Sequence, residues 1–167
     1  MCTNRISRRR FLAGVPRLGV AGFLVTPLAG LLSACQDQRW PVGMADIKWD
    51  RDTCTRCHMV ISDRRFAAEL RGGNPDTVFK FDDVGCLVFW MQEQAGRYPW
   101  MSAPGIKAWV ADFNSRSRDE MTWLDPFQAR YIPRTSPMGY GFAGLAANLG
   151  EGIDFESMRQ RVLARGK

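Results

Sequence analysis

The feature of this chain that most constrains its fold is its N-terminal segment, which has the pattern of an export signal. A twin-arginine pattern occupies residues 7–12, and an apolar stretch from Leu18 to Leu32 follows it. Glycines, a threonine and a proline interrupt this stretch, so it lacks the roughly 20 strongly apolar residues that a membrane-spanning helix needs. The pattern therefore predicts a signal peptide over residues 1–34, which leaves residues 35–167 to fold.

The end of this segment, residues 32–35 (Leu-Ser-Ala-Cys), has the pattern of a lipobox. In such a motif small side chains precede the cut, and the cysteine thiol then carries diacylglycerol. The sequence predicts lipidation at Cys35, followed by a lipid tether over residues 35–45, which are polar and broken by proline and glycine. We expect a protein on the periplasmic side of the cell envelope, lipid-anchored to a membrane. Cleavage nearby, with Cys35 as a free thiol, is the alternative.

Removal of the signal peptide changes the charge and the cysteine count of the folded part. Five arginines and no acidic residue leave with it, so the formal net charge falls from +6 to +1. A nearly neutral domain lacks the attraction for phosphate that dominates nucleic-acid binding, and we expect no nucleic acid as a partner. Only Cys54, Cys57 and Cys86 remain besides Cys35. Three thiols in an exported chain indicate a site rather than a framework of disulfides.

The apolar pattern predicts a small single α+β domain over residues 46–167. Apolar residues from Val84 to about Gln94 recur at helical spacing, which predicts a helix capped by Asp82 or Asp83. Each half of the domain has strand patterns followed by a helix, so we expect two related ββα(β) units packed together. Strands are expected at residues 47–49, 59–61, 66–70, 77–81, 106–113, 121–124 and 130–132, and the second and third of these are expected to form a hairpin. Residues 135–144 are expected to be irregular. A second helix is expected from a cap at Asp154 to about Ala164.

Metal-ligating side chains are concentrated in residues 54–59, Cys-Thr-Arg-Cys-His-Met. Sulfur ligands favour Cu(I), Zn(II) or iron–sulfur clusters over Mg or Ca. Cys54-x-x-Cys57-His58 is also the pattern of a c-type haem site, which would make this an electron-transfer protein. The cysteine pair alone is typical of a thiol–disulfide oxidoreductase. A structural zinc ion would need a fourth ligand besides the three cysteines.

The strand expected after this run argues against haem and against an oxidoreductase, whose Cys-x-x-Cys begins a helix. Cu(I) accepts two or three soft ligands, and such a site can release its ion, as a carrier must. Cys57 and Met59 would lie on one face of an extended segment, and Met138 could close the site. Cys86 is expected to be a small buried residue of the first helix. The chain shows no nucleophile–base pair and no phosphate-binding glycine loop, so no enzymatic activity is predicted.

Several blocks of the sequence together resemble the NosL family, lipoproteins accessory to nitrous oxide reductase. The blocks are residues 54–68, 81–87, 123–132 and 137–142, in the family's order within about residues 46–149. The resemblance implies a compact α+β fold and a membrane-tethered metallochaperone that delivers Cu(I) for the copper–sulfide centre of nitrous oxide reductase. It implies the reductase and its Nos ABC-type maturation complex as partners.

The same resemblance assigns the metal ligands by position. It gives Cys57, Met59 and Met138 as ligands of Cu(I), and Cys54 as a second or accessory ligand. Many relatives have glycine where this chain has His58. The imidazole of His58 could add a nitrogen ligand, or it could point away from the site.

Overall fold

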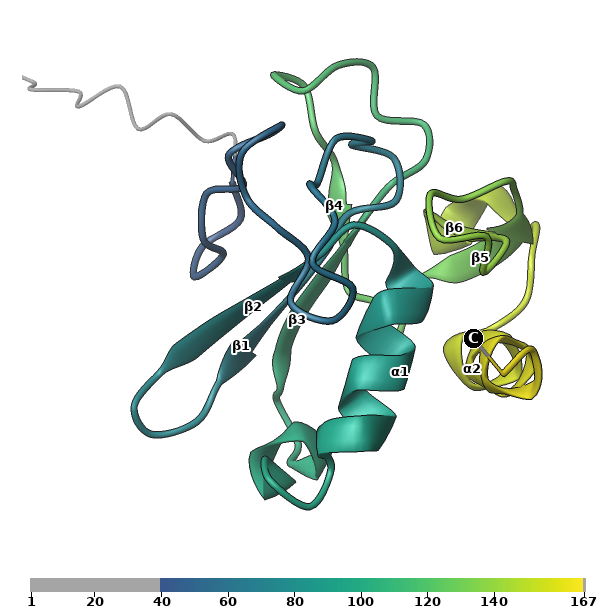
Figure 1. The fold of residues 1–167 in the computed structure, drawn as a ribbon. Coiled ribbons are helices and arrows are strands. Elements are labelled where there is room, and N and C mark those ends of the chain that lie inside the picture. Colours follow the sequence, from purple (N-terminus) through teal and green to yellow (C-terminus); the bar gives the residue numbers. More distant parts are fainter. Residues whose placement is uncertain (1–39, 167) are drawn as a thin grey trace, which may run out of the picture. The chain divides into compact units, whose positions relative to one another are not determined.

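A four-stranded antiparallel sheet with the order β2-β1-β3-β4 lies at the centre of the fold, and a second sheet pairs β5 with β6 (Figure 1). The structure is a computed structural model and describes residues 40–166. The predicted signal peptide, Cys35 and the first part of the tether lie outside the described residues. The described residues belong to one compact unit. The strands are β1 (Ala68–Gly72), β2 (Thr77–Phe81), β3 (Lys107–Ala111), β4 (Trp123–Leu124), β5 (Arg130–Pro133) and β6 (Phe142–Leu145); the helices are α1 (Val84–Gln94), α2 (Phe155–Ala164) and the short 3₁₀ helices η1 (Pro99–Ser102) and η2 (Ala147–Leu149).

The two faces of the central sheet are covered by different parts of the chain. Alternation along β1 places Leu70 in the cluster that packs against Leu87 of α1, and α2 packs on the other side of α1 (Figure 1). The opposite face carries Glu69 and is covered by residues 44–47, of which Met44 and Ile47 are buried. The backbone N–H of Ala45 in this segment donates to Glu69 Oε1 at 2.7 Å. Among residues 40–166, no helix is long and apolar enough to cross a membrane.

The small single α+β domain predicted from the sequence is confirmed. The first helix has the predicted bounds, and of the two proposed caps it is Asp83 that accepts a hydrogen bond from the N–H of Gly85. In both halves strands precede a helix, but β3 and β4 extend the first sheet instead of starting another. The second helix begins after its predicted cap, Asp154, which accepts a hydrogen bond from the N–H of Ser157.

Two predictions about strands are wrong. Residues 47–49 and 59–61 form no strand, and β1 pairs with β2 and β3 instead of with residues 59–61. Val60 makes only an isolated bridge to Thr53, because the chain has just reversed direction between these two residues. The glycine-rich stretch expected to be irregular contains the start of β6, which begins at Phe142 and pairs with β5.

Candidate metal centre

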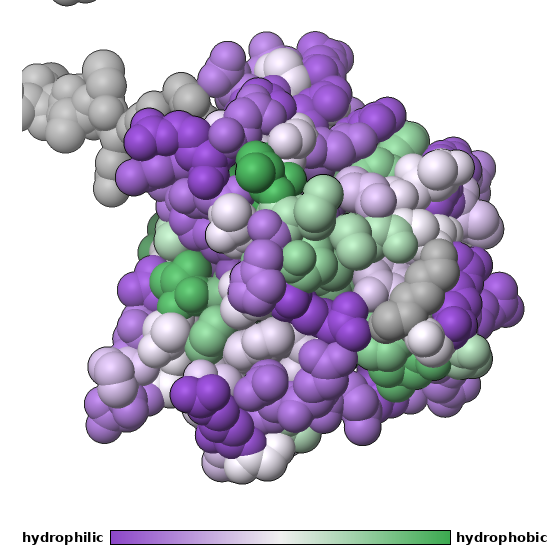
Figure 2. Space-filling view, in the orientation of Figure 1, coloured by the Kyte–Doolittle hydropathy of each residue, from purple (hydrophilic) through white to green (hydrophobic). Residues whose placement is uncertain are grey.

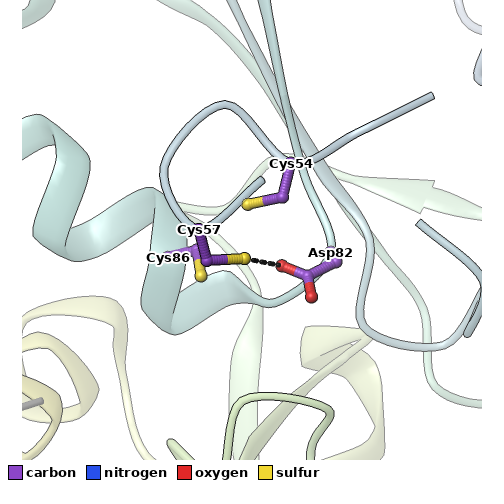
Figure 3. Close-up of side chains that lie close together, drawn as sticks. All are labelled: Cys54, Cys57, Asp82 and Cys86. Carbon is purple, nitrogen blue, oxygen red and sulfur yellow. Dashed lines mark hydrogen bonds between the residues drawn. The ribbon is translucent and has the colours of Figure 1, made fainter. Parts of the chain in front are cut away.

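Three thiols and one carboxylate converge between the loop of residues 54–59 and the start of α1 (Figure 3). The ligand atoms of Cys54, Cys57, Asp82 and Cys86 all lie within 4.8 Å of one another. Cys54 and Cys86 are fully buried, Asp82 is 3% exposed and Cys57 is half-buried. The Cys57 thiol donates to Asp82 Oδ1 at 3.4 Å, as the dashed line in Figure 3 shows. We call these four side chains the Cys/Asp cluster.

The loop reaches the cluster because it folds back on itself. The N–H of Cys54 donates to the carbonyl of Met59 at 2.8 Å, and the N–H of His58 donates to the carbonyl of Cys54 at 2.9 Å. His58 has φ +63°, a left-handed conformation that closes this reversal. Thr55 then ties the loop to β2, because its N–H donates to the carbonyl of Lys80 and its hydroxyl accepts from the Lys80 N–H. The two cysteines are thereby held beside the end of β2.

The start of α1 supplies the other two ligand atoms. Asp83 caps the helix through Oδ1 and accepts the N–H of Met138 through Oδ2 at 3.1 Å. The capping is therefore done by Asp83, and the carboxylate of Asp82 contacts the thiols. Cys86 lies in the first turn of α1, and its sulfur lies within 4.8 Å of a carboxylate oxygen of Asp82.

An arginine fixes the loop to the body of α1. Arg56 donates from Nε and Nη2 to the carboxylate of Glu93, and from Nη1 to the hydroxyl of Tyr140 at 2.6 Å. Its guanidinium also lies over the ring of Phe89, 4.6 Å from the centroid. Gly85 allows this arrangement, since a Cβ there would lie 2.2 Å from the ring of Tyr140. The loop is thus held on one side by β2 and on the other by α1.

Burial and hydrogen bonding distribute the protons of the Cys/Asp cluster unevenly. A hydrogen bond from Cys86 lowers the pKa of the Cys54 thiol to about 4. The Cys86 thiol donates that hydrogen bond and is buried, and both effects raise its pKa far above the usual range. Burial also raises the pKa of Cys57 to about 12 and the pKa of Asp82 to about 6. Of the three thiols, Cys54 is therefore the one whose deprotonation is favoured, and Cys57 and Cys86 must lose a proton to become thiolate ligands.

The Cys/Asp cluster could hold a metal ion. Thiolate sulfur binds zinc at about 2.3 Å, so two sulfurs of a tetrahedral site lie about 3.8 Å apart, and no two sulfurs on one such ion lie more than about 4.6 Å apart. The ligand atoms of the cluster all lie within 4.8 Å of one another, so small movements of the side chains would bring them to one ion. The donor set of three sulfurs and one oxygen is soft, which favours Cu(I) or Zn(II) over Mg or Ca.

The structure brings together only part of the ligand set expected from the sequence. Cys54 and Cys57 meet in the cluster, whereas His58 is exposed and is not one of the four grouped residues. Met59 is 58% exposed, and Met138 is half-buried with its backbone bonded beside the cluster. Ligation by His58 and the two methionines stays a prediction.

Sequence reasoning missed Asp82 as a site residue, because it was interpreted as a possible helix cap. Cys86 was grouped with Cys54 and Cys57 only as a possible third ligand of a structural zinc ion, and was otherwise expected to be a small buried residue. Nothing in the sequence alone groups Asp82 with the three cysteines.

Comparisons with protein-family models, with curated proteins and with solved structures find no match to this chain. The resemblance to the NosL family therefore stays a prediction that rests on the sequence blocks alone.

Proposed function

We propose that this protein is a membrane-tethered Cu(I)-binding metallochaperone on the periplasmic side of the cell envelope. It would deliver copper for assembly of the copper–sulfide centre of nitrous oxide reductase, beside the Nos ABC-type maturation complex. The observation that carries the proposal is the convergence of Cys54, Cys57 and Cys86 on one point of the fold. The choice of client comes from the resemblance to the NosL family.

The donor set suits copper as cargo. Cu(I) is bound by two or three thiolates without a further ligand, so the three sulfurs suffice. Burial of Cys54 and Cys86 keeps two of these thiols away from solvent. Cys57 is half-buried and lies in the loop that also exposes Met59, so an acceptor can reach the ion at this side. A carrier needs such an exit, whereas a structural ion does not.

The other two interpretations of the cysteine run have less support. A haem held by thioethers at both cysteines needs space beside Cys54, which is fully buried next to Cys86. A thiol–disulfide oxidoreductase places its cysteine pair at a helix N-terminus, but residues 54–57 lie in a hydrogen-bonded turn.

Structural zinc is the second candidate, because Asp82 could supply the fourth ligand that sequence analysis did not identify. A tetrahedral Zn(II) ion accepts thiolate and carboxylate ligands, and four would close the site. The two metals make different demands on Asp82. Zinc needs its oxygen as a ligand, whereas Cu(I) with three sulfurs does not.

Competition with a chromophoric chelator, without oxygen, tests the choice of metal. We expect one Cu(I) per chain, held strongly by the wild type and much more weakly by Cys57→Ser and Cys86→Ser. Asp82→Asn should retain Cu(I) and lose Zn(II). Met101→Leu, a change at a buried methionine outside the cluster, is the control for Met59→Leu and Met138→Leu. Unchanged Cu(I) affinity in Cys57→Ser would contradict the site, and stronger binding of Zn(II) than of Cu(I) in competition would favour the zinc candidate.

A separate experiment tests the client. Deletion of the gene should leave nitrous oxide reductase deficient in copper, and reintroduction of the wild type should restore it, whereas Cys86→Ser should not. Normal copper content after deletion would reduce the proposal to general copper binding.

A further inference from the structure

A pocket lined mainly by arginines lies outside the Cys/Asp cluster. Its volume is about 510 Å³. The turn after residue 61 forms one wall, and the loop between β3 and β4 forms the other. The lining residues are Ser62, Asp63, Arg64, Arg65, Arg116, Ser117 and Arg118. We call it the arginine pocket.

Two of its four arginines are neutralised by carboxylates. Arg65 forms an ion pair with Asp63, with 2.6 Å between Nη2 and Oδ2. Arg118 forms an ion pair with Asp50 and also donates to the carbonyl of Ser62. These contacts orient the two guanidinium groups and neutralise their charge. Arg65 and Arg118 therefore shape the walls of the pocket but add no net positive charge to it.

The other two arginines form no ion pair with a carboxylate among residues 40–166. Arg64 donates from Nη2 to the carbonyl oxygens of Ser115 and Arg116, at 2.7 and 2.9 Å, and its buried Nε has no hydrogen-bond partner. The side chain of Arg116 forms no ion pair within that range and is exposed. The pocket thus keeps an excess of positive charge, and the planar guanidinium group is well suited to the oxygens of a phosphate.

The position of the arginine pocket indicates which phosphate it meets. Arg118 lies over the ring of Trp49, 5.7 Å from the centroid, and Trp49 packs near Trp40, with 6.3 Å between the ring centroids. Trp40 is also 5.5 Å from Trp123. In Figure 1 the loop between β3 and β4 and the start of the described chain lie at the same, upper end, where Figure 2 shows mostly hydrophilic surface.

That end of the domain is where the tether would hold it to a membrane. Five residues from Cys35 to Trp40 span at most about 18 Å even when fully extended. A lipid on Cys35 would therefore keep the tryptophans and the arginine pocket near the headgroups. Tryptophan is enriched at membrane interfaces, and arginine is attracted to anionic lipids there.

We propose that the arginine pocket binds the phosphate group of an anionic phospholipid headgroup. The inference rests on the lipid anchor proposed at Cys35 and is independent of the metal carried. Binding at this pocket would add a second membrane contact to the lipid and would fix which end of the domain faces the bilayer. Free phosphate offers the same oxygens, so the experiment includes it as a separate arm.

The test uses residues 36–167, so that no lipid anchor contributes; the described part of this range forms a compact unit with its own hydrophobic clusters. Sedimentation with phosphatidylcholine vesicles should show binding only when phosphatidylglycerol is included, and salt should weaken it. Arg116→Gln should bind about five-fold more weakly, which corresponds to the roughly 1 kcal/mol that one arginine contributes at an anionic surface. Arg64→Gln with Arg116→Gln should bind about 25-fold more weakly on the same basis.

The control is Arg97→Gln with Arg161→Gln, which removes the same charge from exposed positions on other elements. It should bind nearly as well as the wild type. Equal losses in the two double variants, or no binding to anionic vesicles, would overturn the proposal. Protection of the pocket from hydrogen exchange by inorganic phosphate, without vesicle binding, would overturn the assignment to a lipid. The side chain of Arg116 is exposed and forms no ion pair among residues 40–166, so misfolding would not explain a loss in its single variant. Unchanged Cu(I) binding in all variants separates this result from the proposed function.

Discussion

Replacement of His58 by glycine is expected to stabilise the domain without weakening Cu(I) binding. His58 has φ +63°, and a left-handed conformation costs a residue with a Cβ about 1–2 kcal/mol. Glycine avoids this cost but loses about 0.5–1 kcal/mol through the greater freedom of the unfolded chain. The difference between the two ranges predicts that His58→Gly gains about 0.75 kcal/mol in free energy of unfolding, within limits of about 0 and 1.5 kcal/mol. The hydrogen bond from its N–H to the carbonyl of Cys54 stays.

His58→Ala is the matched control, because it removes the imidazole but keeps the Cβ. Urea unfolding of the metal-free, reduced chains should place His58→Gly above both the wild type and His58→Ala. Cu(I) competition on the same three chains tests ligation. His58 is exposed and outside the Cys/Asp cluster, so we expect equal affinities. If glycine gave no advantage over alanine, the reasoning from φ would be refuted; if both variants lost affinity together, the imidazole would be a ligand.

Three further predictions concern the packing around the site. Gly85→Ala should lower the free energy of unfolding by about 1–3 kcal/mol in urea, because a Cβ would lie 2.2 Å from Tyr140, whereas Gly96→Ala, in open space, should not. Arg56→Gln should weaken Cu(I) binding about 10–100-fold in chelator competition by releasing the loop, and an unchanged affinity would remove Arg56 from the support of the site. Burial raises the pKa of Glu69 from 4.5 to about 7, so the folded state keeps a proton that the unfolded state loses. The free energy of unfolding should therefore fall by up to about 3 kcal/mol as pH rises from about 4.5 to 7. Urea unfolding at several pH values measures this slope, and Glu69→Gln should flatten it.

The sequence predicted those elements whose apolar pattern is long and local. α1 has the predicted bounds because its helical spacing persists over eleven residues and Asp83 caps it. β2 has the bounds expected from the alternation of residues 77–81. Such patterns reflect a face that must be buried, which depends little on the rest of the chain.

The missed strands have causes outside the local pattern. Residues 59–61 look like a strand, but the turn that joins the N–H of Cys54 to the carbonyl of Met59 uses these residues to close the loop. β6 contains Gly144, which is typical of an irregular segment. A Cβ at Gly144 would lie 2.9 Å from the carbonyl oxygen of Ala111, so the glycine reflects close packing against β3. Contacts of this kind join distant segments, and a single sequence does not show them.

Only part of the candidate site could be predicted from the sequence, for the same reason. Cys54 and Cys57 are adjacent in the sequence and could be grouped by their spacing. Cys86 joins them across 29 residues from Cys57, through the pairing of Thr55 with Lys80 at the end of β2. This contact exists only in the folded chain, so the sequence could show that Cys86 is buried but not what it touches.

The unequal exposure of the three thiols has a consequence for the rate at which an ion could leave. Cys54 and Cys86 are fully buried, and the loop that carries Cys57 is tied to β2 and to α1. An incoming group can therefore form its first bond to the ion only beside Cys57, before the bonds to the inner sulfurs break. Exchange by this route is associative: its rate rises with the concentration of the acceptor, and a small thiol exchanges faster than a bulky chelator of greater affinity. Retention of the ion in the absence of an acceptor would then be kinetic as well as thermodynamic.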